Sequence, residues 1–496
     1  MCALEGIVGG VEVPAKGRVV SKLNGDGFVL EGHHKAGERA VAPGRWHPST
    51  SGGGRAMQVV LLHPELGLGG AERLVVDVAL ALMHHGHSVT LLCTHHDTGR
   101  CFAETLNSHG SRAFWICLRG SALPRSLAGS LSAACSLARN AFLSAVIASS
   151  NSLRSADAIV LDQLASPLPL LRALLPRRTR LVYYCHFPDS LLAPHSPPLR
   201  RPLRALYRLP LDLAETSAIN RADSIIANSH FTSTTLLQTI RRMHNHPLVV
   251  HPCVALPERS SLTPSGDCRT STRLLRSAGV ALPQSWVDNH SPTIPFVSIN
   301  RFEEKKGLQL AVRAFAEALN ADDTYRTTTR PYQEHQPSAV LVIAGGFDSR
   351  LQECATVLQS LQHEAELHGV RDRTFFLLSF SDKQKESLLD ACTALVYTPV
   401  NEHFGIAPLE AMARARPVIA TNTGGPVESV VDGECGWLKS PQPEAFADAM
   451  RECMRDEGEC ENRGQNGYDR VSQHFAFPAF SERITNAIVH GTVCND

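Results

Sequence analysis

Residues 58–93 read QVVLLHPELGLGGAERLVVDVALALMHHGHSVTLLC, and this stretch determines the fold class. An apolar run at 58–63 ends in a glycine-rich turn, and the apolar residues of 71–86 then recur with helical spacing. A second apolar run follows at 88–93. Strand, helix and strand in this order predict two parallel strands joined by a helical crossover.

The same alternation continues along the chain and is interrupted by one change of composition. The later apolar runs lie at 156–162, 180–186, 223–229, 248–252, 295–301, 339–346, 375–380, 394–399 and 417–422. Short runs that are apolar throughout indicate strands covered on both faces, as in parallel sheets. Because a Pro-, Ser- and Arg-rich segment divides the runs into two sets, we expect an α/β protein with two Rossmann-like domains facing an interdomain cleft.

Composition and periodicity also suggest where the domains begin and end. We expect a leader at 1–56 that is disordered or only partly ordered, an N-terminal Rossmann-like domain at 57–254 and a linker or insertion at 255–293. A C-terminal Rossmann-like domain at 294–470 and a C-terminal helix at 471–496, packing back on the N-terminal domain, complete the chain. A polar stretch at 321–338 is typical of a surface-loop insertion.

Charge and cysteine usage exclude several classes of protein. The 496 residues contain 48 Lys+Arg and 48 Asp+Glu, and this zero net charge argues against a general nucleic-acid binder. The 14 cysteines include no C-x-x-C pair and favour reduced thiols in a cytosol-facing location. Residues 127–147 are too polar for a confident membrane span, so a helix packed on a sheet and a helix in the bilayer interface both stay open.

The turn after the first strand contains Gly67, Gly69 and Gly70 before Glu72. Glycines at a helix N-terminus allow backbone N–H groups to approach an anion. A dinucleotide fingerprint would require glycine at the position of Glu72, and no GK[ST] follows, so both common nucleotide loops fail. A contact with an anion or sugar and a plain tight turn therefore remain the two interpretations.

A second constellation follows the predicted strand at 394–399. Glu402 lies in the loop after that strand, and Glu410 lies just inside the helix that Pro408 can begin. Ligands of doubly wound sheets bind at this edge, where two carboxylates can hold vicinal hydroxyls of a sugar and a ribose. The N–H groups of Phe404–Ile406 are placed to hold a phosphate. A solvated loop glutamate and an ordinary first-turn carboxylate are the alternatives.

The Glu-x7-Glu spacing with PVIATNTGGPVES at 417–429 resembles the retaining nucleotide-sugar glycosyltransferases with two Rossmann-like domains. More closely, the chain resembles the α-1,3/1,6-mannosyltransferase family of dolichol-linked oligosaccharide assembly. The segments that carry this resemblance are LHPELGLGGAERLVVDVALAL (62–82), YYCHFPD (183–189), SINRFEEKKGLQLA (298–311), AGGFDSR (344–350), SFSDKQKESLL (379–389) and TPVNEHFGIAPLEAM (398–412).

The resemblance implies a GT-B fold with a C-terminal helical crossover and a retaining mannosyltransferase. It also implies that the N-terminal domain faces the acceptor and the membrane and that the C-terminal domain binds the nucleotide sugar. Such an enzyme moves mannose from GDP-mannose, as co-substrate, to a lipid-pyrophosphate-linked Man-GlcNAc2 core, first as an α-1,3 and then as an α-1,6 branch. The implied location is the cytosolic face of the endoplasmic reticulum membrane, as a peripheral or monotopic protein. The implied partners are the dolichol-pyrophosphate-linked oligosaccharide, that membrane surface and other mannosyltransferases of the pathway, with no nucleic acid.

The resemblance also implies residue roles. Arg301 and Lys306 match an Arg-x4-Lys pair that would hold the diphosphate as it gains charge, and Lys305 stays open as the contact instead. Glu402 would hold mannose hydroxyls, and His186 would lie beside the donor sugar. The other implied donor-binding residues are Glu410, Phe404, Gly405, Ile406, Phe380, Gly424 and Gly425, and Gly69 and Gly70 would face the diphosphate or the acceptor.

The chain contains no D-x-D motif, and its histidine spacings match no ligand set, so we expect no metal site and no essential metal cofactor. Two fixed cations would replace the metal at the diphosphate. Arginines at near-helical spacing, Arg200, Arg201 and Arg204, favour contact with anionic headgroups or with the acceptor pyrophosphate. A solvated basic face is the alternative.

Other functions remain open at this level. A related retaining glycosyltransferase with another donor or acceptor fits the broad motifs equally well. A catalytically silent sugar-binding scaffold is opposed by the intact Arg301, Lys306, Glu402 and Glu410, and a nicotinamide dehydrogenase is opposed by Glu72. The sequence does not reveal whether one site makes both linkages, the oligomeric state, the mode of membrane attachment, or the role of the leader and of the two insertions.

Overall fold

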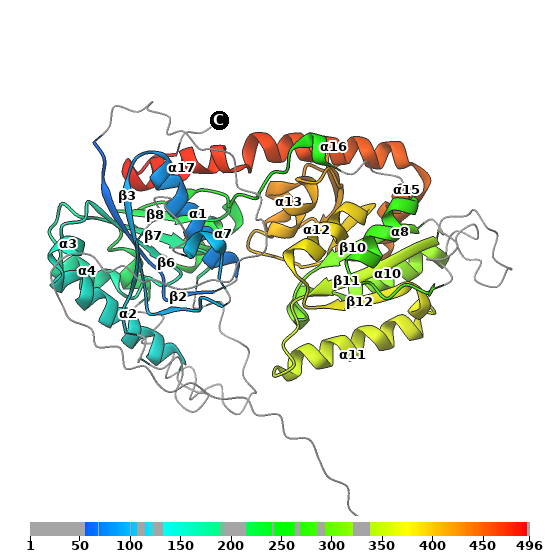
Figure 1. Ribbon diagram of the computed structural model, residues 1–496, viewed down its shortest axis with the longest axis horizontal. Coiled ribbons are helices and arrows are strands. Elements are labelled where there is room, and N and C mark those ends of the chain that lie inside the picture. The colour runs from blue at the N-terminus through cyan, green and yellow to red at the C-terminus, as the bar shows by residue number, and fades with distance from the viewer. Residues whose placement is uncertain are drawn as a thin grey trace, which may run out of the picture. The chain divides into compact units, whose positions relative to one another are not determined.

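Two parallel sheets organise the chain in the computed structural model (Figure 1). The structure describes residues 55–67, 69–99, 101–106, 115–120, 123, 132–188, 191, 215–240, 243–262, 268–284, 293–320 and 338–493. These residues fall within one compact unit that spans residues 48–496. Of the predicted leader at 1–56, only residues 55 and 56 are among them, and nearly all of the predicted insertion at 321–338 lies outside.

The first sheet has seven strands in the order β5-β3-β1-β6-β7-β8-β9. The strands are β1 (Gln58–Leu62), β3 (Ser88–Cys93), β5 (Trp115–Leu118), β6 (Ala158–Asp162), β7 (Arg180–Cys185), β8 (Ser224–Ala227) and β9 (Leu248–Val249). All pairings are parallel, and β1 lies between β3 and β6. A separate pair, β2 (Glu65–Leu66) and β4 (His95–His96), lies just beyond the ends of β1 and β3.

Helices cover both faces of the first sheet. One face packs on α1 (Gly70–His84) and α17 (Phe477–Val489), the other on α2 (Ser132–Ser149), α3 (Asn151–Arg154), α4 (Leu168–Leu174) and α7 (His230–Thr239). Alternate residues of one strand enter opposite clusters: Leu61 packs under α1, whereas Leu62 packs under α2. This explains why the strands read as continuous apolar runs.

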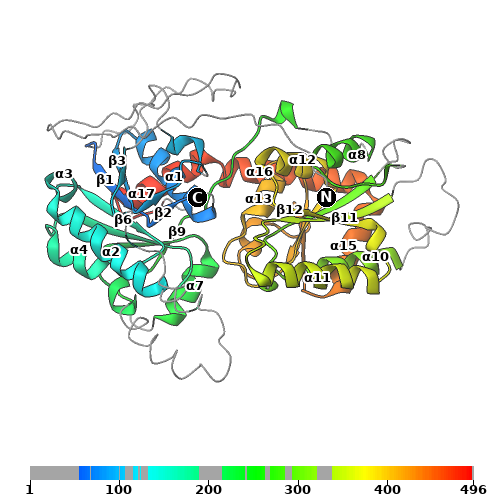
Figure 2. The same cartoon turned by 60° about the horizontal axis from the view of Figure 1, so that its bottom comes forward.

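The second sheet has six parallel strands in the order β12-β11-β10-β13-β14-β15. The strands are β10 (Thr293–Ile299), β11 (Ser338–Gly345), β12 (Thr374–Leu378), β13 (Ala394–Tyr397), β14 (Val418–Thr421) and β15 (Gly436–Lys439). One face packs on α10 (Gln309–Asn320), α11 (Gln352–Leu367) and α15 (Pro443–Arg455), and the other on α8 (Cys268–Ser277), α12 (Asp382–Ala391) and α13 (Ile406–Met412). Figure 2 shows these helices from a second direction. The two sheets confirm the predicted α/β fold with two Rossmann-like domains.

The end of the chain passes from the second sheet to the first. Helix α16 (Glu457–His474) follows α15 and contributes Cys460 and Val471 to the cores around the second sheet. After Phe475, helix α17 buries Phe480, Ile484 and Ile488 in the core of the first sheet beside α1. The C-terminal residues therefore belong to the core of the N-terminal domain, although they are distant in sequence.

The segment predicted as a linker at 255–293 differs from that prediction in part. Helix α8 lies inside it and packs on α12 and β10. Leu275 of this helix, and Ala278 and Val280 just after its end, are buried in the second core. Sequence composition hid this helix because its arginines, serines and threonines outnumber its apolar residues. Within the helix, the buried Thr272 and Leu275 are three residues apart and therefore lie on one face.

Among the helices of the described residues, none is both long and apolar enough to cross a bilayer. The segment at 127–147 contains most of α2, whose Leu143 and Ile147 are fully buried against the first sheet. Phe142 on the same helix is 40% exposed. Most of the cysteines among the described residues are buried, and all of them are free thiols.

Candidate active site

The carboxyl edge of the second sheet brings the predicted Lys306 and Glu402 together. Lys306 ends a short 3-10 turn, Glu304–Lys306, after β10, and Glu402 follows neighbouring strand β13. The Lys306 Nζ donates to Glu402 Oε2 at 2.5 Å, and their side chains are only 10% and 20% exposed. Thr398 Oγ1 also donates to the Lys306 carbonyl at 2.8 Å, which ties the two loops together.

Glu410 forms a second pair at the same edge. It lies in α13, where its Oε1 accepts from Lys385 Nζ of α12 at 2.8 Å. Burial lowers the pKa of Lys385, but the charge of Glu410 and its hydrogen bond outweigh this and raise the pKa above its ordinary value. Helix α12 begins at a capping box formed by Ser381 and Gln384, which fixes the direction from which Lys385 approaches.

The two other cations of this segment face outward. Arg301 is 65% exposed and pairs with Glu303 at 2.7 Å, and Lys305 is 64% exposed and pairs with the same glutamate at 3.2 Å. Lys306 is therefore the cation of this run that contacts Glu402, whereas Lys305 points elsewhere. Arg301 lies at the same strand end but is held away from Glu402 by its own glutamate partner.

The predicted glycines at 424 and 425 lie against the Glu402 loop. The Gly425 N–H donates to the Glu402 carbonyl oxygen at 2.8 Å. Gly424 has φ +69°, and a Cβ there would lie 2.5 Å from that same carbonyl oxygen. A side chain at 424 would displace Glu402, so these glycines position the carboxylate whether or not they also approach a ligand.

His186 follows β7 at the carboxyl edge of the first sheet. Its Nε2 lies 2.7 Å from Asp162 Oδ1, and His63 Nδ1 lies 2.8 Å from Asp162 Oδ2. Burial would raise the pKa of Asp162, but the charges and hydrogen bonds of the two histidines outweigh it and hold the pKa well below its ordinary value. Burial likewise lowers the pKa of His186, but Asp162 and Glu72 outweigh it, so the pKa is raised overall.

His403, next to Glu402, contacts residues of the first domain directly. Its ring stacks on Phe187, with centroids 3.7 Å apart and planes 7° from parallel, and its carbonyl accepts from Ser229 Oγ at 2.5 Å. Burial lowers the pKa of His403 to about 4, so the ring is neutral at pH 7. A neutral imidazole packed on an aromatic face brings the loop of Glu402 next to His186–Phe187.

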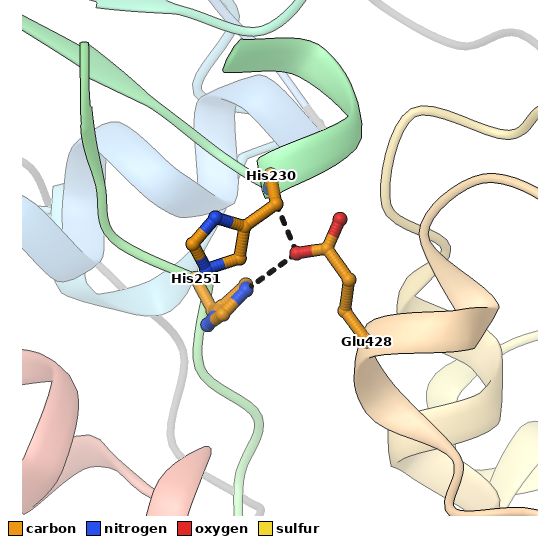
Figure 3. Close-up of side chains that lie close together, drawn as sticks. All are labelled: His230, His251 and Glu428. Carbon is orange, nitrogen blue, oxygen red and sulfur yellow. Dashed lines mark hydrogen bonds and ion pairs between the residues drawn. The ribbon is translucent and has the colours of Figure 1, made fainter. Parts of the chain in front are cut away.

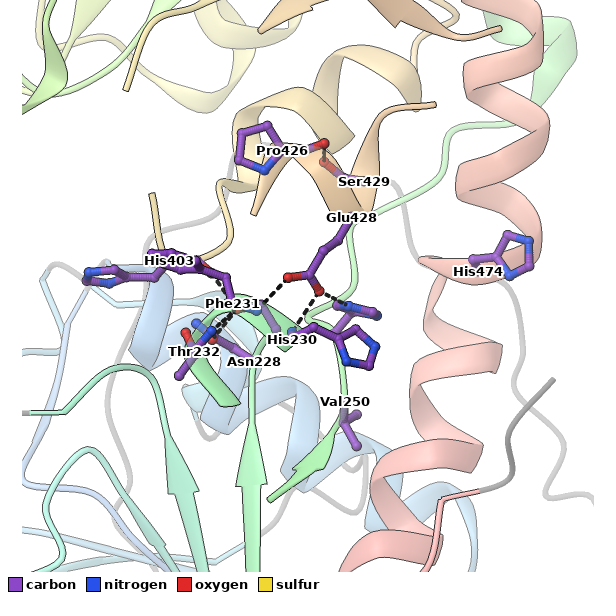
Figure 4. A network of polar contacts seen from close by, with 12 residues as sticks. Asn228, His230, Phe231, Thr232, Val250, His403, Pro426, Glu428, Ser429 and His474 are labelled. Carbon is purple, nitrogen blue, oxygen red and sulfur yellow. Dashed lines mark hydrogen bonds and ion pairs between the residues drawn. The ribbon is translucent and has the colours of Figure 1, made fainter. Parts of the chain in front are cut away.

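Glu428 makes a further contact between the two domains (Figure 3). Its carboxylate accepts from the backbone N–H groups of His230 and Phe231, each at 2.8 Å, and from His251 Nε2 at 2.8 Å. The first two donors begin helix α7, whose N-cap Ser229 also accepts from Thr232 N–H. Figure 4 shows this carboxylate at the end of the helix, where a negative charge is stabilised.

The ligand atoms of His230, His251 and Glu428 lie within 4.8 Å of one another, a set that resembles a metal site. Three N–H groups already point at the two oxygens of Glu428, however, and a cation would have to displace them. Burial raises the pKa of Glu428, but these hydrogen bonds outweigh it and lower the pKa below its usual value. We therefore regard the cluster as a hydrogen-bonded clasp between domains.

The glycine turn leads into α1 as predicted. Gly69 is the N-cap and Gly70 the first helical residue, so the first N–H groups of α1 are directed along the turn. Glu72, in the first turn, is close enough to His186 to raise its pKa. The turn and His186 therefore share one edge of the first sheet.

The remaining predicted residues have these positions. Phe404 is buried, Gly405 is the N-cap of α13 and Ile406, its first residue, is 37% exposed. Phe380 packs against the second core just before α12, so part of its ring is covered by protein. Arg200, Arg201 and Arg204 lie outside the described residues.

Sequence reasoning missed Asp162, Phe187, His403, Lys385 and Glu428, and it assigned no role to His63. Asp162 carried a usable signal, because it is a carboxylate ending the apolar run at 156–162. The partners of the other residues come from segments far away in the chain, which no local pattern connects.

Two family models match the chain: Glycosyltransferase Family 4 over residues 68–256 and Glycosyl transferases group 1 over residues 287–470. The Alpha-1,3/1,6-mannosyltransferase ALG2 of Dictyostelium discoideum is 36% identical over 436 residues, which are 88% of this chain and 98% of that protein. The Homo sapiens protein of the same name is 36% identical over 432 residues, 86% of this chain and 94% of that protein.

Solved structures support the fold. Sucrose-phosphate synthase from Thermosynechococcus elongatus aligns with a TM-score of 0.64 at 18% identity, covering 87% of this chain and 98% of that one. WaaG, a glycosyltransferase involved in lipopolysaccharide biosynthesis, aligns with a TM-score of 0.55 at 16% identity, covering 87% and 100%. At these identities the likeness concerns the arrangement of the two domains and not the substrates.

Proposed function

The chain belongs to the α-1,3/1,6-mannosyltransferases of N-glycan precursor assembly, and from this membership we propose which substrates its site takes. It is a mannosyltransferase that uses a nucleotide-sugar donor and a lipid-linked oligosaccharide acceptor. We propose GDP-mannose as the donor and Man-GlcNAc2 on dolichol pyrophosphate as the acceptor. The first mannose forms an α-1,3 branch and the second an α-1,6 branch, both with retention of configuration.

The ion pair between Lys306 and Glu402 is the observation that carries this proposal. Both groups are partly buried, and each holds the other in place where a donor would lie. When the diphosphate enters, its oxygens replace the carboxylate as partner of Lys306, and Glu402 turns to the mannose hydroxyls. Arg301, whose side chain is exposed, would add a second positive charge at the diphosphate.

Bond breaking follows from the same charges. The bond between mannose C1 and the phosphate oxygen breaks, and GDP leaves with the electron pair. Lys306 and Arg301 would stabilise this developing charge more than they stabilise the ground state, which lowers the barrier. The acceptor hydroxyl oxygen bonds to C1 on the same face and gives its proton to the departing phosphate, so the donor-side carboxylates need not act as nucleophiles.

Glu410 would hold the ribose hydroxyls, because it lies in α13, the helix that follows the Glu402 loop at the same edge of the sheet. The N–H groups of Gly405 and Ile406 would bind the phosphates, and Phe380 would lie along the guanine. Gly69 and Gly70, at the start of α1, would contact the diphosphate or the acceptor. We also propose that no metal is essential, because Lys306 and Arg301 supply the positive charge at the diphosphate.

A transfer assay tests these assignments. Purified protein is incubated with GDP-mannose and lipid-linked Man-GlcNAc2 pyrophosphate, with and without EDTA, and product linkages are determined by mass and exoglycosidase digestion. We expect two sequential additions, unaffected by the chelator. Transfer only from UDP-sugars would show another donor, a complete lack of transfer would favour a sugar-binding scaffold, and loss with EDTA would overturn metal independence.

We propose the cytosolic face of the endoplasmic reticulum as the location, with peripheral or monotopic attachment and other mannosyltransferases of the pathway as neighbours. Support comes from α2 and α4, which expose Phe142, Leu170 and Leu174 to 40%, 37% and 39%. Exposed Arg177 and Arg178 follow α4, and such residues favour an anionic surface by ~1 kcal/mol each.

Vesicle flotation tests this attachment. Replacing Phe142, Leu170 and Leu174 by serine should reduce binding to vesicles that contain phosphatidylserine, because less apolar surface can enter the interface. Replacing Arg200, Arg201 and Arg204 by glutamate should reduce binding further and make it less sensitive to salt. Unchanged flotation of both variants would exclude these surfaces as the site of attachment.

A further inference from the structure

Each of three adjacent strands in the first sheet has a polar residue at its carboxyl end or directly after it. His63 follows β1, Asp162 is the last residue of β6, and His186 follows β7 after Cys185. Because β1, β6 and β7 are neighbours in the sheet, the three side chains form a row along its carboxyl edge. None of the sequence motifs connects them, and only the order of the strands brings them together.

The row runs from the interior toward the surface. The side chains of His63 and Asp162 are 1% and 5% exposed, whereas that of His186 is 24% exposed. Both oxygens of Asp162 are occupied, Oδ2 by His63 Nδ1 at 2.8 Å and Oδ1 by His186 Nε2 at 2.7 Å. A buried carboxylate held at both oxygens cannot rotate without losing a hydrogen bond, so its position is fixed.

The contact with Asp162 determines which nitrogen of His186 carries hydrogen. A carboxylate only accepts, so Nε2 must be the N–H donor, and the neutral ring then has its lone pair on Nδ1. Among the residues that the structure describes, no hydrogen bond reaches Nδ1. Nδ1 is therefore free to accept from a hydroxyl when the ring is neutral, or to donate to one when the ring is protonated.

Other groups near His186 strengthen the same arrangement. Glu72 of α1 adds negative charge on one side, and the Tyr184 ring of β7 lies 5.2 Å from the imidazole. His403, which lies across the domain contact, is held neutral by burial and adds no positive charge to the site at pH 7. The next residue, Phe187, is fixed by its stacking on His403. The ring of His186 is thus constrained through both its side chain and its backbone.

We infer that Asp162 is a positioning residue of the transfer reaction, which holds His186 so that Nδ1 meets a sugar hydroxyl, and that His63 holds Asp162 in turn. The inference rests on the proposed function, in which His186 contacts the sugar. The hydroxyl belongs either to the mannose of the donor or to the acceptor, and separate kinetics for each substrate distinguish the two. Asp162 itself touches neither substrate and acts through His186.

The main test is Asp162→Asn in the full-length protein. Asparagine keeps the size of the side chain but loses the charge and offers N–H groups to one of the two imidazoles, which disturbs its tautomer. We expect kcat to fall about 10- to 100-fold, because an imidazole without its supporting carboxylate is displaced from the productive geometry. The limb of the pH–rate profile that reports the ionisation of His186 should move to lower pH. The negative charge of Asp162 favours the imidazolium form, so its removal lowers the pKa of His186.

Three comparisons separate positioning from a general structural effect. On a His186→Gln background, Asp162→Asn should cause no further loss of kcat. Asp162→Glu should keep part of the kcat, and part of the pH dependence, that Asp162→Asn loses. The matched control is Asp157→Asn at the other end of β6, where Asp157 accepts from Gln58 N–H at 2.9 Å.

The KM values of Asp162→Asn identify the hydroxyl that His186 contacts. If KM rises for GDP-mannose alone, the hydroxyl belongs to the donor, and if KM rises for the lipid-linked acceptor alone, it belongs to the acceptor.

Several outcomes would overturn the inference. One is kcat for Asp162→Asn within twofold of the parent; another is an equal loss with and without His186, or an unshifted pH profile. Should Asp162→Asn not fold, His63→Leu removes one support of the carboxylate instead, and unchanged kcat and pH profile would again contradict the inference. If the parent does not use GDP-mannose, the proposed function fails, and NMR titration of labelled His186 still decides, because an unchanged pKa in Asp162→Asn contradicts positioning.

Discussion

The carboxyl edges of the two sheets both carry carboxylates that are hydrogen-bonded to histidine or lysine side chains, but they use them differently. At the first sheet, Asp162 is 5% exposed and lies between two imidazoles. At the second sheet, Glu402 and Glu410 are 20% and 23% exposed and are each held by one lysine, Lys306 and Lys385. One edge holds a fixed row of groups, and the other holds two separate pairs whose carboxylates are more exposed.

The difference in burial explains the difference in role. A buried carboxylate that loses a partner is left with an uncompensated charge, so the row at the first sheet is stable only when complete. A lysine on a flexible stem can exchange a carboxylate for a phosphate at little cost, because its charge stays paired. Under the proposed function, the first edge would therefore position a group, and the second edge would bind the charged donor and respond to it.

The largest effect should come from breaking the pair at the second edge. Lys306→Ala or Glu402→Ala should lower kcat about 10²- to 10³-fold, as expected when a group that stabilises developing charge is removed. Lys305→Ala is the matched control, because this neighbouring lysine is 64% exposed and pairs with Glu303 instead. Initial rates of mannose transfer measure both. Equal losses in the two lysine variants would refute the assignment of Lys306.

Next in size should be the effect of moving Glu402 without replacing it. Gly424→Ala places a Cβ 2.5 Å from the Glu402 carbonyl oxygen at φ +69°, so the loop must shift and kcat should fall up to about 10²-fold. Gly433→Ala is the control, because its φ is +81° but nothing lies within 4 Å of its Cβ. Both variants should lose about 1–3 kcal/mol of stability from backbone strain. Similar kcat values in the two would show that the Glu402 loop tolerates displacement.

A smaller effect should follow from opening the clasp at Glu428, which holds the two edges near one another. Glu428→Gln should lower the free energy of unfolding at pH 7 by about 1–2 kcal/mol, because a charged cap of α7 is lost. The folded-state pKa of Glu428 lies below its ordinary 4.5. Its contribution is therefore present above pH 4.5 and disappears as pH falls through the lower folded value.

Urea unfolding at several pH values measures this contribution. The parent should lose stability between neutral and acid pH more steeply than Glu428→Gln, and the two should converge at low pH. The exposed Glu434 offers a control on the same domain, and Glu434→Gln should follow the parent. Parallel curves for Glu428→Gln and the parent would mean that the carboxylate contributes no linkage.

The smallest effect should come from the pair formed by Glu410 and Lys385 at the carboxyl edge of the second sheet. Glu410→Gln should raise KM for GDP-mannose about 3- to 10-fold and leave kcat nearly unchanged, since one hydrogen bond made equally in ground and transition states is weakened. Steady-state kinetics at saturating acceptor measure the split. A fall in kcat as large as that of Glu402→Ala would place Glu410 at the reacting centre and remove the distinction between the two pairs.

Much of the fold and of the second edge follows from local sequence. The prediction placed a helix at 71–86, and α1 spans Gly70–His84. Glu402 and Glu410 could be recognised in the sequence, because both lie in one continuous segment directly after a predicted strand. Helix α8 was missed because arginine and serine dominate its composition. Which of its residues are buried is seen only in the folded structure.

At the carboxyl edge of the first sheet, local sequence revealed only some of the residues. His186 was found through its HFPD segment, but its partner Asp162 lies 24 residues earlier and His63 lies 99 residues before Asp162. The contact between His403 and Phe187 likewise joins two domains. Spacing along the chain contains no information on which strands become neighbours, so such partners could not be assigned.

Periodicity and short-range spacing were enough to predict the alternation of strands and helices, the division into two sheets and the loop that carries Glu402 and Glu410. Only the folded chain shows which lysine meets Glu402, which carboxylate holds His186 and where Glu428 contacts α7. Those contacts depend on strand order and on burial. Burial determines whether a charge must find a partner, and strand order determines which partner lies within reach.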